Sequence, residues 1–362
     1  METKTSIPLL VDRIGQTMSA IGRRLQIMEI CGTHTVSLFR TGVKSLLPES
    51  LKLVSGPGCP VCVTSQGYID AACELASRPD VTICTYGDMV RVPGRTGSLE
   101  RQRASGASVV VIYSARDAVR FAAEHPDRQV VMLGVGFETT APATAAAVLE
   151  AEAKGLTNFT VLPGHKLVIP AMAALLSAGD VPIDGFLCPG HVSIVIGAKA
   201  YQPIVDVHRR PCVVAGFEPE NMLLGILHIV EQISRSEARL ENVYPVAVTH
   251  EGNAVARQWL DRVFEPGPTV WRAMGTIADS GLVLRDVYRR YDALERFGLT
   301  IGADYDPPGC RCGEVIQGKV EPVECTLFGR ACTPTRPVGP CMVSSEGTCA
   351  AWFKYGGLGA RG

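Results

Sequence analysis

The sequence predicts an α/β protein with two similar parallel-sheet lobes and a third region that is rich in loops and cysteine. Three observations support this fold class. From about residue 24, short β-branched runs alternate with longer helical patterns, which is typical of βα units on a parallel sheet. After about residue 240 the pattern becomes more polar. From Asp304 onward the chain is rich in Gly, Pro and Cys, so this end needs a covalent or metal staple in place of its own core.

Each expected strand is a short apolar run, and most are followed by a helical pattern. The expected strands are residues 25–30, 51–55, 81–84, 109–113, 130–134, 159–162, 185–188 and 212–215. The expected helices are residues 66–77, 115–124, 142–154, 167–177 and 219–234, with two more polar helices at 252–264 and 282–297.

These strands are too many for one small sheet without an insertion, so we expect them to divide between two lobes. The first lobe is expected over residues 24–120 and the second over residues 121–235. The third region then combines residues 1–23 with residues 236–362. A Pro-Gly-His turn follows a strand twice, ending at His165 and at His191, which is consistent with a duplicated βα unit.

Composition limits the function classes. The 362 residues include 35 Lys and Arg against 36 Asp and Glu, for a formal net charge of −1. Because there is no basic excess, neither nucleic acid nor a membrane is an expected partner. The sequence has no run of about 18 apolar residues that would span a bilayer. Its first residues also lack the apolar core of a signal peptide, so we expect a cytoplasmic protein.

The 13 cysteines need a metal or redox explanation, because structural disulfides are rare in a reducing cytoplasm. Five of them lie within the first 84 residues, and six lie between residues 310 and 349. This uneven distribution predicts two chemically different sites.

The first candidate site is built from motifs that follow expected strands. Cys31-Gly-Thr-His-Thr35 follows the first strand, and Gly56-Pro-Gly-Cys-Pro-Val-Cys62 follows the second. Ligands of open parallel sheets bind beyond the carboxyl ends of the strands. We therefore expect these motifs to share one crevice with residues 134–140 and with both Pro-Gly-His turns.

Cys59 and Cys62 have the C-x-x-C spacing of dithiol redox sites and of soft-metal sites. Two thiolates on one turn can form a disulfide or occupy adjacent positions on one metal ion, and a helix N-terminus favours the thiolate form. Cys31 is expected to supply a third sulfur, with His34 as a ligand or proton donor. The alternative is that these cysteines are structural thiols.

Residues 134–140 resemble a phosphate-binding glycine turn, but Thr139 replaces its third glycine and no Walker lysine follows. Glu138 is therefore expected to form hydrogen bonds at a helix N-terminus, either within the site or as a simple cap. His165 and His191 are expected to face the crevice, because Pro-Gly turns expose them. The alternative is a histidine bonded only to its own turn. Glu138 and His191 are candidate catalytic residues on this basis.

The second candidate site is the cysteine-rich tail. Structural zinc usually requires C-x2–4-C pairs, and the tail has none. Six thiols suit a [4Fe–4S] cluster, which takes four thiolates, together with a redox dithiol. A disulfide-stapled tail is the alternative, and it needs an oxidising compartment. The six residues are Cys310, Cys312, Cys325, Cys332, Cys341 and Cys349.

Together these motifs resemble the HypD family of hydrogenase maturation proteins. The resemblance rests on residues 31–35 and 56–62, on Gly-Phe-Glu-Thr-Thr at 136–140, on Pro-Gly-His-Val-Ser at 189–193 and on the cysteine-rich tail. It extends from about residue 24 to the Tyr355-Gly-Gly end. Because five separate motifs occur in order, the resemblance is specific.

The resemblance implies a scaffold on which the Fe(CN)2CO group of [NiFe] hydrogenases is assembled. It implies that Fe2+ carrying CN and CO ligands is held near Cys31, Cys59 and Cys62. The implied partners are a HypC-type small chaperone, the HypE/HypF pair that delivers cyanide and, indirectly, the hydrogenase large subunit. Such a protein is a maturation scaffold with redox activity rather than a conventional turnover enzyme.

The tail is similar to the cluster region of ferredoxin–thioredoxin reductase, where a [4Fe–4S] cluster lies beside a redox-active dithiol. This similarity assigns the cluster to Cys310, Cys325, Cys332 and Cys349, and the dithiol to Cys312 and Cys341. Spacing alone permits other divisions of the six. We hypothesise that electrons pass from the cluster through this dithiol to Cys59 and Cys62.

Two alternative functions remain open from the sequence. One is a thiol–disulfide oxidoreductase of the ferredoxin–thioredoxin reductase type, which reduces a protein partner through Cys59 and Cys62 and needs no sulfur at Cys31. The other is a purely structural zinc protein. Substitution of Cys31 separates the first alternative from the scaffold, and the colour of anaerobically purified protein tests the second.

Overall fold

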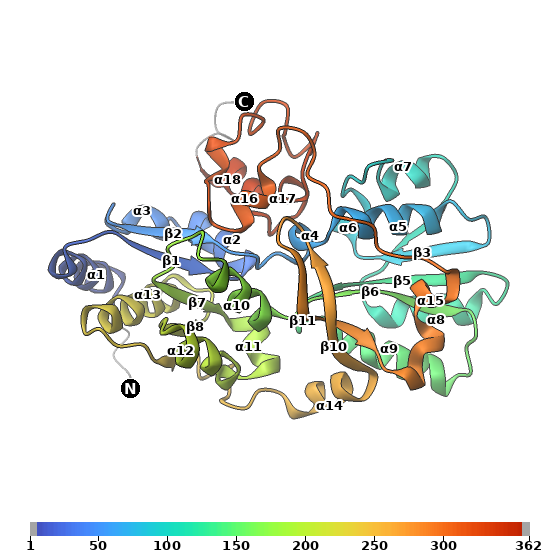
Figure 1. Ribbon diagram of the computed structural model, residues 1–362, viewed down its shortest axis with the longest axis horizontal. Helices are drawn as coiled ribbons and strands as arrows, with labels where there is room; N and C mark the ends of the chain where they lie inside the picture. The colour runs from blue at the N-terminus through green and yellow to red at the C-terminus, as the bar shows by residue number, and fades with distance from the viewer. Residues whose placement is uncertain (1–5, 357–362) are drawn as a thin grey trace.

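The computed structural model describes residues 6–356 and confirms the predicted fold class. Two lobes, each with a parallel sheet, lie side by side, and the C-terminal region packs above their junction (Figure 1). A small antiparallel pair of strands lies between the lobes. Residues 1–5 and 357–362, which belong to the predicted third region and to the end of the Tyr355-Gly-Gly motif, lie outside the described residues.

The first sheet has five parallel strands in the order β2-β1-β7-β8-β9. Apolar side chains on alternate positions of these strands face two helical layers, which explains why the runs are almost continuously buried. The strands are β1 (Leu25–Glu29), β2 (Leu51–Ser55), β7 (Gly185–Pro189), β8 (Cys212–Ala215) and β9 (Leu240–Asn242). The flanking helices are α1 (Ile7–Ile21) and α13 (Pro219–Ser234) on one face, and α10 (Val168–Ala178) and α12 (Gln202–His208) on the other.

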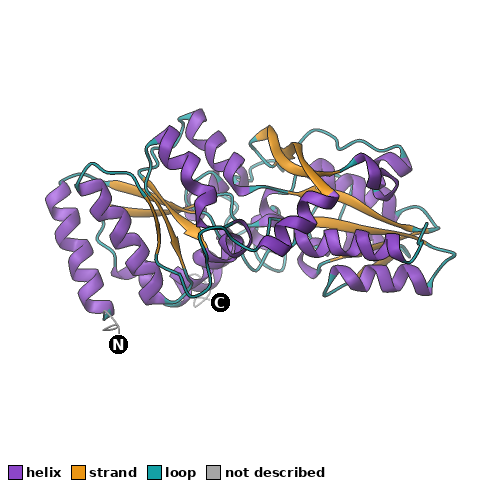
Figure 2. Ribbon diagram, turned by 90° about the horizontal axis from the view of Figure 1, so that it is seen from below, coloured by secondary structure: helices purple, strands orange, loops and turns teal. Residues whose placement is uncertain are grey.

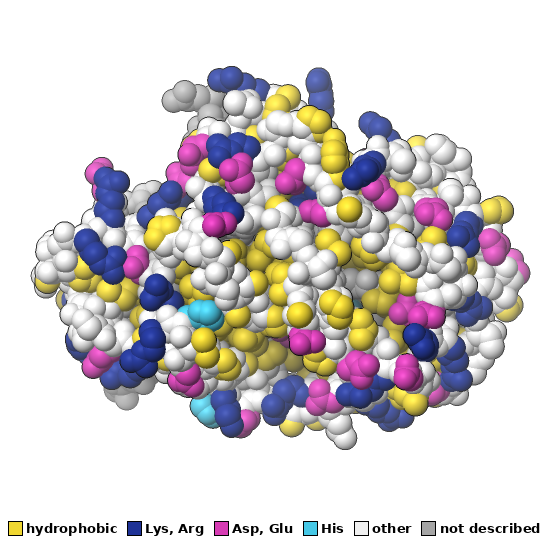
Figure 3. All heavy atoms as spheres, in the orientation of Figure 1, with side chains coloured by type: hydrophobic (Ala, Val, Ile, Leu, Met, Phe, Trp, Pro, Cys, Tyr) yellow, Lys and Arg dark blue, Asp and Glu magenta, His cyan; other side chains and the backbone are white. Residues whose placement is uncertain are grey.

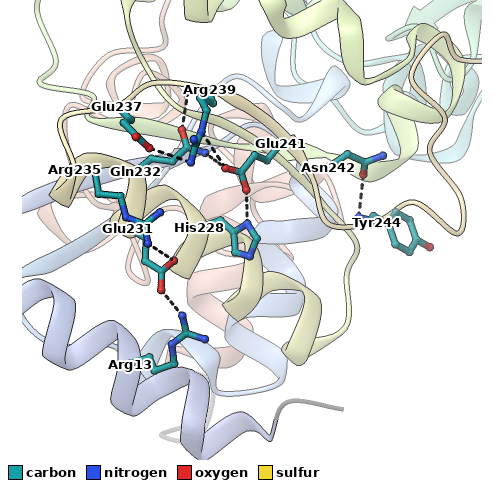
Figure 4. A network of polar contacts seen from close by, with 10 residues as sticks. All are labelled: Arg13, His228, Glu231, Gln232, Arg235, Glu237, Arg239, Glu241, Asn242 and Tyr244. Atoms are coloured by element: carbon teal, nitrogen blue, oxygen red, sulfur yellow. Dashed lines mark hydrogen bonds and ion pairs between the residues drawn. The ribbon is translucent and has the colours of Figure 1, made fainter. Parts of the chain in front are cut away.

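A polar network fastens the outer helices to the edge of this sheet (Figure 4). Arg13 of α1 pairs with Glu231 of α13. On the same helix, Gln232 donates to Glu241 of β9 (2.9 Å), and His228 bonds the same carboxylate. His228 thus has a structural partner far from the motifs.

The second sheet has four parallel strands in the order β4-β3-β5-β6. It is covered by helices on both faces (Figure 2). The strands are β3 (Val81–Thr85), β4 (Ser108–Val111), β5 (Gln129–Gly136) and β6 (Phe159–His165). The helices are α5 (Gln66–Ala76), α6 (Gly87–Val90) and α7 (Leu99–Ala104), and, against the other face, α8 (Ala115–Glu124) and α9 (Ala141–Ala153).

The chain crosses between the two sheets twice. It leaves the first sheet after β2 through residues 56–66, builds the whole second sheet, and returns through α10 to β7. The two sheets therefore do not divide at residue 120, where we expected the first lobe to end. Hydrophobic periodicity identifies strands, but parallel pairing joins strands that are distant in sequence, as when β1 pairs with β7.

A β-hairpin that sequence analysis missed connects the lobes. It consists of β10 (Phe264–Trp271) and β11 (Gly275–Leu284), and it follows α14 (Ala254–Val263), which matches an expected helix. The helix expected over residues 282–297 is wrong. Its first residues complete β11, and the 3-10 helix η2 (Asp286–Tyr291) and short α15 (Ala293–Phe297) follow. Pro266 and Pro268 argue against a strand in the sequence, because proline has no amide hydrogen to donate and is confined to edge strands. Both strands of this two-stranded hairpin are edge strands.

The tail is loop-rich, as predicted, with only short helical turns. They are α16 (Cys312–Ile316), η3 (Pro322–Glu324), α17 (Pro340–Val343) and α18 (Thr348–Tyr355). This region packs on three short helices that follow β1 and β2, which are α2 (Gly32–Arg40), α3 (Val43–Leu46) and α4 (Pro60–Val63). Two further short helices, α11 (Gly190–Ile196) and η1 (Ala198–Tyr201), follow β7. Within residues 6–356, every helix is too short or too polar to traverse a bilayer.

Candidate functional site

Cys31 and the Cys59–Cys62 pair lie side by side beyond two neighbouring strands. Cys31 follows β1 and caps α2, and Cys59 follows β2 and caps α4. The amide of Gly32 donates to the carbonyl oxygen of Gly58 (3.2 Å). A Cβ atom on Gly58 would lie 2.3 Å from the Cys31 nitrogen, so only glycine permits this approach.

Cys59 and Cys62 form a disulfide, with their Cα atoms 5.2 Å apart. The intervening Pro60 and Val61 belong to the four-residue helix α4, and the amide of Cys62 donates to Cys59 Sγ (3.2 Å). This segment is the first crossing between the lobes. A redox change here therefore occurs where the two sheets are joined.

Cys31 is a free, buried thiol. Burial raises its pKa to about 12, and the nearby Glu346 and Glu29 carboxylates act in the same direction. Such a thiol is a poor nucleophile by itself. A soft cation would convert it to thiolate, because metal binding displaces the thiol proton.

Glu29 forms a hydrogen bond with the Cys31 backbone, and the sequence alone did not identify this residue. Its carboxylate accepts hydrogen bonds from the Cys31 amide (3.0 Å) and from the Thr35 hydroxyl. The side chain is buried, and burial raises the pKa of Glu29 to about 7. An acidic residue at the last position of a mostly apolar strand was the signal that could have identified it.

The tail reaches over this site and contacts both lobes. Thr33 Oγ1 donates to Glu346 Oε1 (2.8 Å), and a Cβ atom on Gly32 would lie 2.5 Å from Glu346 Cβ. The adjacent Ser345 donates its amide to Asp88 in α6 (3.1 Å). Residues 344–346 thus bridge the helix that follows β1 and the helix that follows β3.

His34 and His191 both contact the ring of Phe217, which follows β8. The ring centroids of His34 and Phe217 are 4.9 Å apart, and those of His191 and Phe217 are 4.1 Å apart. His34 is fully buried, its Nε2 bonds the Gly216 carbonyl oxygen (3.0 Å), and burial lowers its pKa to about 4. His191 is exposed at the start of α11. Phe217 carries no motif signal in the sequence.

Glu138 and His165 belong to the second sheet and are bonded within it and to the crossover helix. Glu138 is buried, its Oε1 accepts from the Val168 amide at the start of α10 (3.0 Å), and burial raises its pKa to about 7. His165 is buried, and its Nε2 bonds Thr144 Oγ1 (2.9 Å). These contacts attach Glu138 to the second crossing between the lobes rather than to the cysteines.

The six tail cysteines line one small pocket, whose remaining walls are mostly apolar. Cys310 and Cys341 are neighbours of Cys312, and the Cys349 amide donates to Cys341 Sγ (3.1 Å). Among residues 6–356, no three Cys, His, Asp or Glu side chains already surround a single point as metal ligands.

The helices that carry Cys312 and Cys341 both pack against α4, the helix of the Cys59–Cys62 disulfide. The tip of the β10–β11 hairpin fills the adjoining space. There the Arg272 amide donates to the Val63 carbonyl oxygen (3.0 Å), and Gln317 donates to the Ala273 carbonyl oxygen (2.9 Å). The disulfide and the tail cysteines therefore belong to one continuous core.

This geometry can be compared with known proteins. A family model described as "HypD: Hydrogenase formation hypA family" matches residues 6–356. The chain belongs to the HypD family.

Curated HypD proteins resemble the chain over nearly its whole length. The "Hydrogenase maturation factor HypD" of Escherichia coli (strain K12) is 46% identical over 334 residues, which cover 92% of this chain and 90% of the relative. That of Rhodobacter capsulatus is 44% identical over 359 residues, covering 98% and 94%. That of Cupriavidus necator is 45% identical over 343 residues, covering 92% and 90%. The chain is thus a HypD-type hydrogenase maturation factor.

Within this HypD fold, the face shown in Figure 3 has hydrophobic side chains gathered near its middle and charges of both signs distributed around them. Such a distribution is typical of protein surfaces that make contact with other proteins. It also agrees with the near-zero net charge of the sequence.

Proposed function

We propose that this chain is the scaffold on which the Fe(CN)2CO group of [NiFe] hydrogenases is assembled. The iron is the substrate, and the thiolates of Cys31, Cys59 and Cys62 hold it. The observation that carries this proposal is the contact between Gly58 and the Cys31 backbone, which brings one free thiol beside a reducible pair. Thiolates suit a ferrous centre that accepts cyanide and carbon monoxide, because both are soft.

The chain acts with partners in this proposal. A HypC-type small chaperone shares the iron, the HypE/HypF pair delivers cyanide, and the hydrogenase large subunit receives the product indirectly. HypD membership supports these partners. Our proposal therefore describes a maturation scaffold with redox activity, located in the cytoplasm, rather than a conventional turnover enzyme.

The tail cysteines fit a [4Fe–4S] cluster in number and chemistry. They line one pocket with apolar walls, and they outnumber the four thiolates that a cluster takes. We assign the ligands as Cys310, Cys325, Cys332 and Cys349. A cluster held there would supply single electrons for the return of Cys312 and Cys341 to the dithiol form. Cys312 lowers the pKa of Cys341, but Cys349 and burial together raise it by more, so the protonated thiol is favoured.

Reduction of the Cys59–Cys62 disulfide by this dithiol is a balanced exchange. A thiolate from Cys312 or Cys341 attacks one disulfide sulfur, and the other sulfur leaves as thiolate. The second thiol of the pair, once deprotonated, then breaks the mixed disulfide. The products are a Cys312–Cys341 disulfide and two free cysteines that can bind iron. Packing of α16 and α17 on α4 supports this route.

Infrared spectroscopy of the anaerobically purified complex with the small chaperone tests the scaffold proposal. Cyanide and carbonyl stretches are expected in the wild type and in Cys73→Ala, which replaces a buried cysteine outside the motifs. They should be lost in Cys31→Ala. A silent wild-type spectrum from a maturation-competent host contradicts the proposal, as do unchanged stretches in Cys31→Ala.

The Cys59–Cys62 disulfide also favours the second candidate, an oxidoreductase of the ferredoxin–thioredoxin reductase type. The same variant separates the two functions, because an oxidoreductase needs no sulfur at residue 31. Unchanged thiol-linked reduction and unchanged hydrogenase maturation in Cys31→Ala favour the oxidoreductase. Loss of bound iron and of maturation favours the scaffold.

The division of the tail cysteines has its own test. We expect Cys312→Ser and Cys341→Ser to keep the brown colour of an iron–sulfur cluster in visible spectra and to lose thiol-linked reduction of Cys59–Cys62. Cys325→Ser is the matched comparison and should lose the colour. If Cys312→Ser or Cys341→Ser is colourless, the division is wrong.

A further inference from the structure

A pocket of about 210 Å3 lies between the end of β6 and the β10–β11 hairpin, apart from the cysteine-lined pocket of the tail. Its volume is several times the roughly 30 Å3 that a water molecule occupies in the liquid. Thr64 and Ser65, which follow Cys62 directly along the chain, form part of its wall. The Pro163-Gly164-His165 turn also lines the pocket, and the proposed iron chemistry does not account for it.

Lys166 lines the pocket and is its distinctive group. Its side chain is only 4% exposed. The ammonium donates to the Val270 carbonyl oxygen (2.8 Å) and lies 5.1 Å from the centre of the Trp271 ring. Its contact with Thr269 Oγ1 is long, at 3.5 Å. Among the described residues, no carboxylate forms an ion pair with it, and a buried cation without a counter-charge is costly.

The other titratable groups around Lys166 are already engaged. Asp292 accepts from the Leu294 amide (2.7 Å) as the cap of α15, and Tyr68 donates to the Leu162 carbonyl oxygen (2.9 Å). His165 bonds Thr144, and Asp304, which acts on Lys166 electrostatically, accepts from the Gln66 amide (2.8 Å). Burial outweighs Asp304 and lowers the pKa of Lys166 to about 7. A bound anion would supply the missing counter-charge.

The walls of the pocket specify the rest of the ligand. They are largely apolar and include Leu282, Leu294 and Ile301. Besides Lys166, their polar groups are hydroxyls, the His165 ring and the Asp292 carboxyl, which caps α15. A dianion such as sulfate would leave charge against these side chains. A single carboxylate on a short hydrocarbon chain matches both the Lys166 ammonium and the apolar walls.

We propose that this pocket binds a small monocarboxylate, whose carboxylate pairs with the Lys166 ammonium and whose hydrocarbon chain packs against Leu282, Leu294 and Ile301. The ligand then lies against Thr64 and Ser65 and braces the segment that carries Cys59 and Cys62. This binding is independent of the proposed iron chemistry. It can be measured on the full chain without any metal.

Isothermal titration calorimetry with sodium propionate tests the proposal, at an ionic strength kept constant with sodium chloride. We expect saturable binding at one site per chain. Lys166→Met, which keeps the length and removes the charge, should weaken it at least tenfold, as expected for loss of a charge-assisted hydrogen bond. Lys199→Met is the matched control, because Lys199 is exposed and pairs with Glu251 on the surface.

A wild-type ligand series keeps the test decisive if Lys166→Met does not fold. Propionamide has the shape of propionate without its charge and should not bind, and sulfate should bind at least tenfold more weakly than propionate. Absence of propionate binding to the wild type overturns the proposal. So does equal binding of propionamide or of sulfate, or unchanged propionate affinity in a folded Lys166→Met.

Discussion

Arg272, at the tip of the β10–β11 hairpin, donates from Nε to the carbonyl oxygen of Thr64 at 3.0 Å. Its Nη2 also donates to Gln66 Oε1 (3.0 Å), and the side chain is fully buried. A residue from the second half of the chain therefore completes the hydrogen bonds of the segment that leaves Cys62. Because the next residue, Ala273, is bonded to Gln317 in the tail, the hairpin tip fixes that segment relative to the tail.

We predict that Arg272→Met loosens the segment that follows Cys62. The change leaves the Thr64 carbonyl oxygen and the Gln66 side chain without their buried donors, at a cost of about 2 kcal/mol in the free energy of unfolding. Hydrogen exchange at residues 63–66 should accelerate, and urea unfolding should report the loss of stability. Arg289→Met is the control, because Arg289 is exposed in surface ion pairs. Equal exchange in both variants would show that Arg272 does not hold the segment.

Gly58→Ala should disrupt the proposed iron-binding site while both sheets remain folded. The added methyl group would lie 2.3 Å from the Cys31 nitrogen and 2.4 Å from the Ile30 carbonyl carbon, and backbone atoms cannot yield as flexible side chains do. We expect a loss of about 1–3 kcal/mol in stability. Iron content of the anaerobically purified protein should fall to the level of Cys31→Ala.

Gly15→Ala provides the matched comparison for this change. Gly15 lies within α1, and nothing lies within 4 Å of an added Cβ atom. Alanine there should raise stability by about 0.5–1 kcal/mol and leave iron content unchanged. Normal iron content in a folded Gly58→Ala would contradict our account of the close approach.

Lys44→Met should release the tail from α2. The Lys44 ammonium lies 4.8 Å from the centre of the Phe39 ring and 4.2 Å from that of Trp352, and so joins α2 to α18. It also lies 3.8 Å from Glu321, a half-exposed pairing that adds little. We expect the free energy of unfolding to fall by about 1 kcal/mol, chiefly through loss of the cation–π contacts.

Limited proteolysis measures this effect, because cleavage within residues 300–356 should become faster than in the wild type. Lys199→Met, which alters only a surface ion pair, should be cleaved at the wild-type rate. If the tail of Lys44→Met resists cleavage as well as that of the wild type, the prediction is wrong. Other contacts, such as that between Thr33 and Glu346, would then hold the tail in place.

The Glu138 carboxyl should make stability depend on pH. Burial raises its folded-state pKa from an ordinary value of 4.5 to about 7, so the folded protein binds this proton more tightly than the unfolded chain does. The contribution of Glu138 to the free energy of unfolding is therefore fully present below about pH 4.5. It is lost as the pH rises through about 7, and the loss is at most about 3 kcal/mol. Urea unfolding at pH 5 and pH 7.5 measures the difference.

Glu138→Gln isolates this dependence, because the amide oxygen can still accept from the Val168 amide and does not titrate. The variant should lose less stability than the wild type between pH 5 and pH 7.5. Glu29, whose pKa is also raised by burial, contributes equally to both proteins and cancels in the comparison. Identical slopes would show that Glu138 is charged throughout this range.

The strands could be predicted from the sequence because each is a compact apolar run, and β2 and β8 have the predicted bounds. Their partners could not be predicted, because the pairing of β1 with β7 joins residues 27–29 to residues 185–187. Nothing local encodes such a contact. The hairpin was hidden for a different reason, since its prolines contradict strand propensity and its stability comes from packing between the lobes.

The proximity of Cys31 to Cys59 could be inferred because both follow neighbouring parallel strands, whose carboxyl ends lie at one edge of the sheet. Their roles as iron ligands stay predictions. Glu29, Phe217 and Arg272 were missed because their importance depends on what lies opposite them. For Arg272, that is a carbonyl oxygen more than 200 residues away.

The double crossing of the chain also constrains how the protein is made. The third strand of the sheet that contains β1 and β2 lies more than 100 residues further along the chain, so it is made well after β1 and β2. The four strands of the other sheet are consecutive in the sequence, so that sheet can form first. Until β7 is made, β1 then has one unpaired edge. A nascent chain that stops before β7 would then expose Cys31 and the C-x-x-C pair on an incomplete sheet, so the proposed iron site would lack its neighbouring strand until β7 is made.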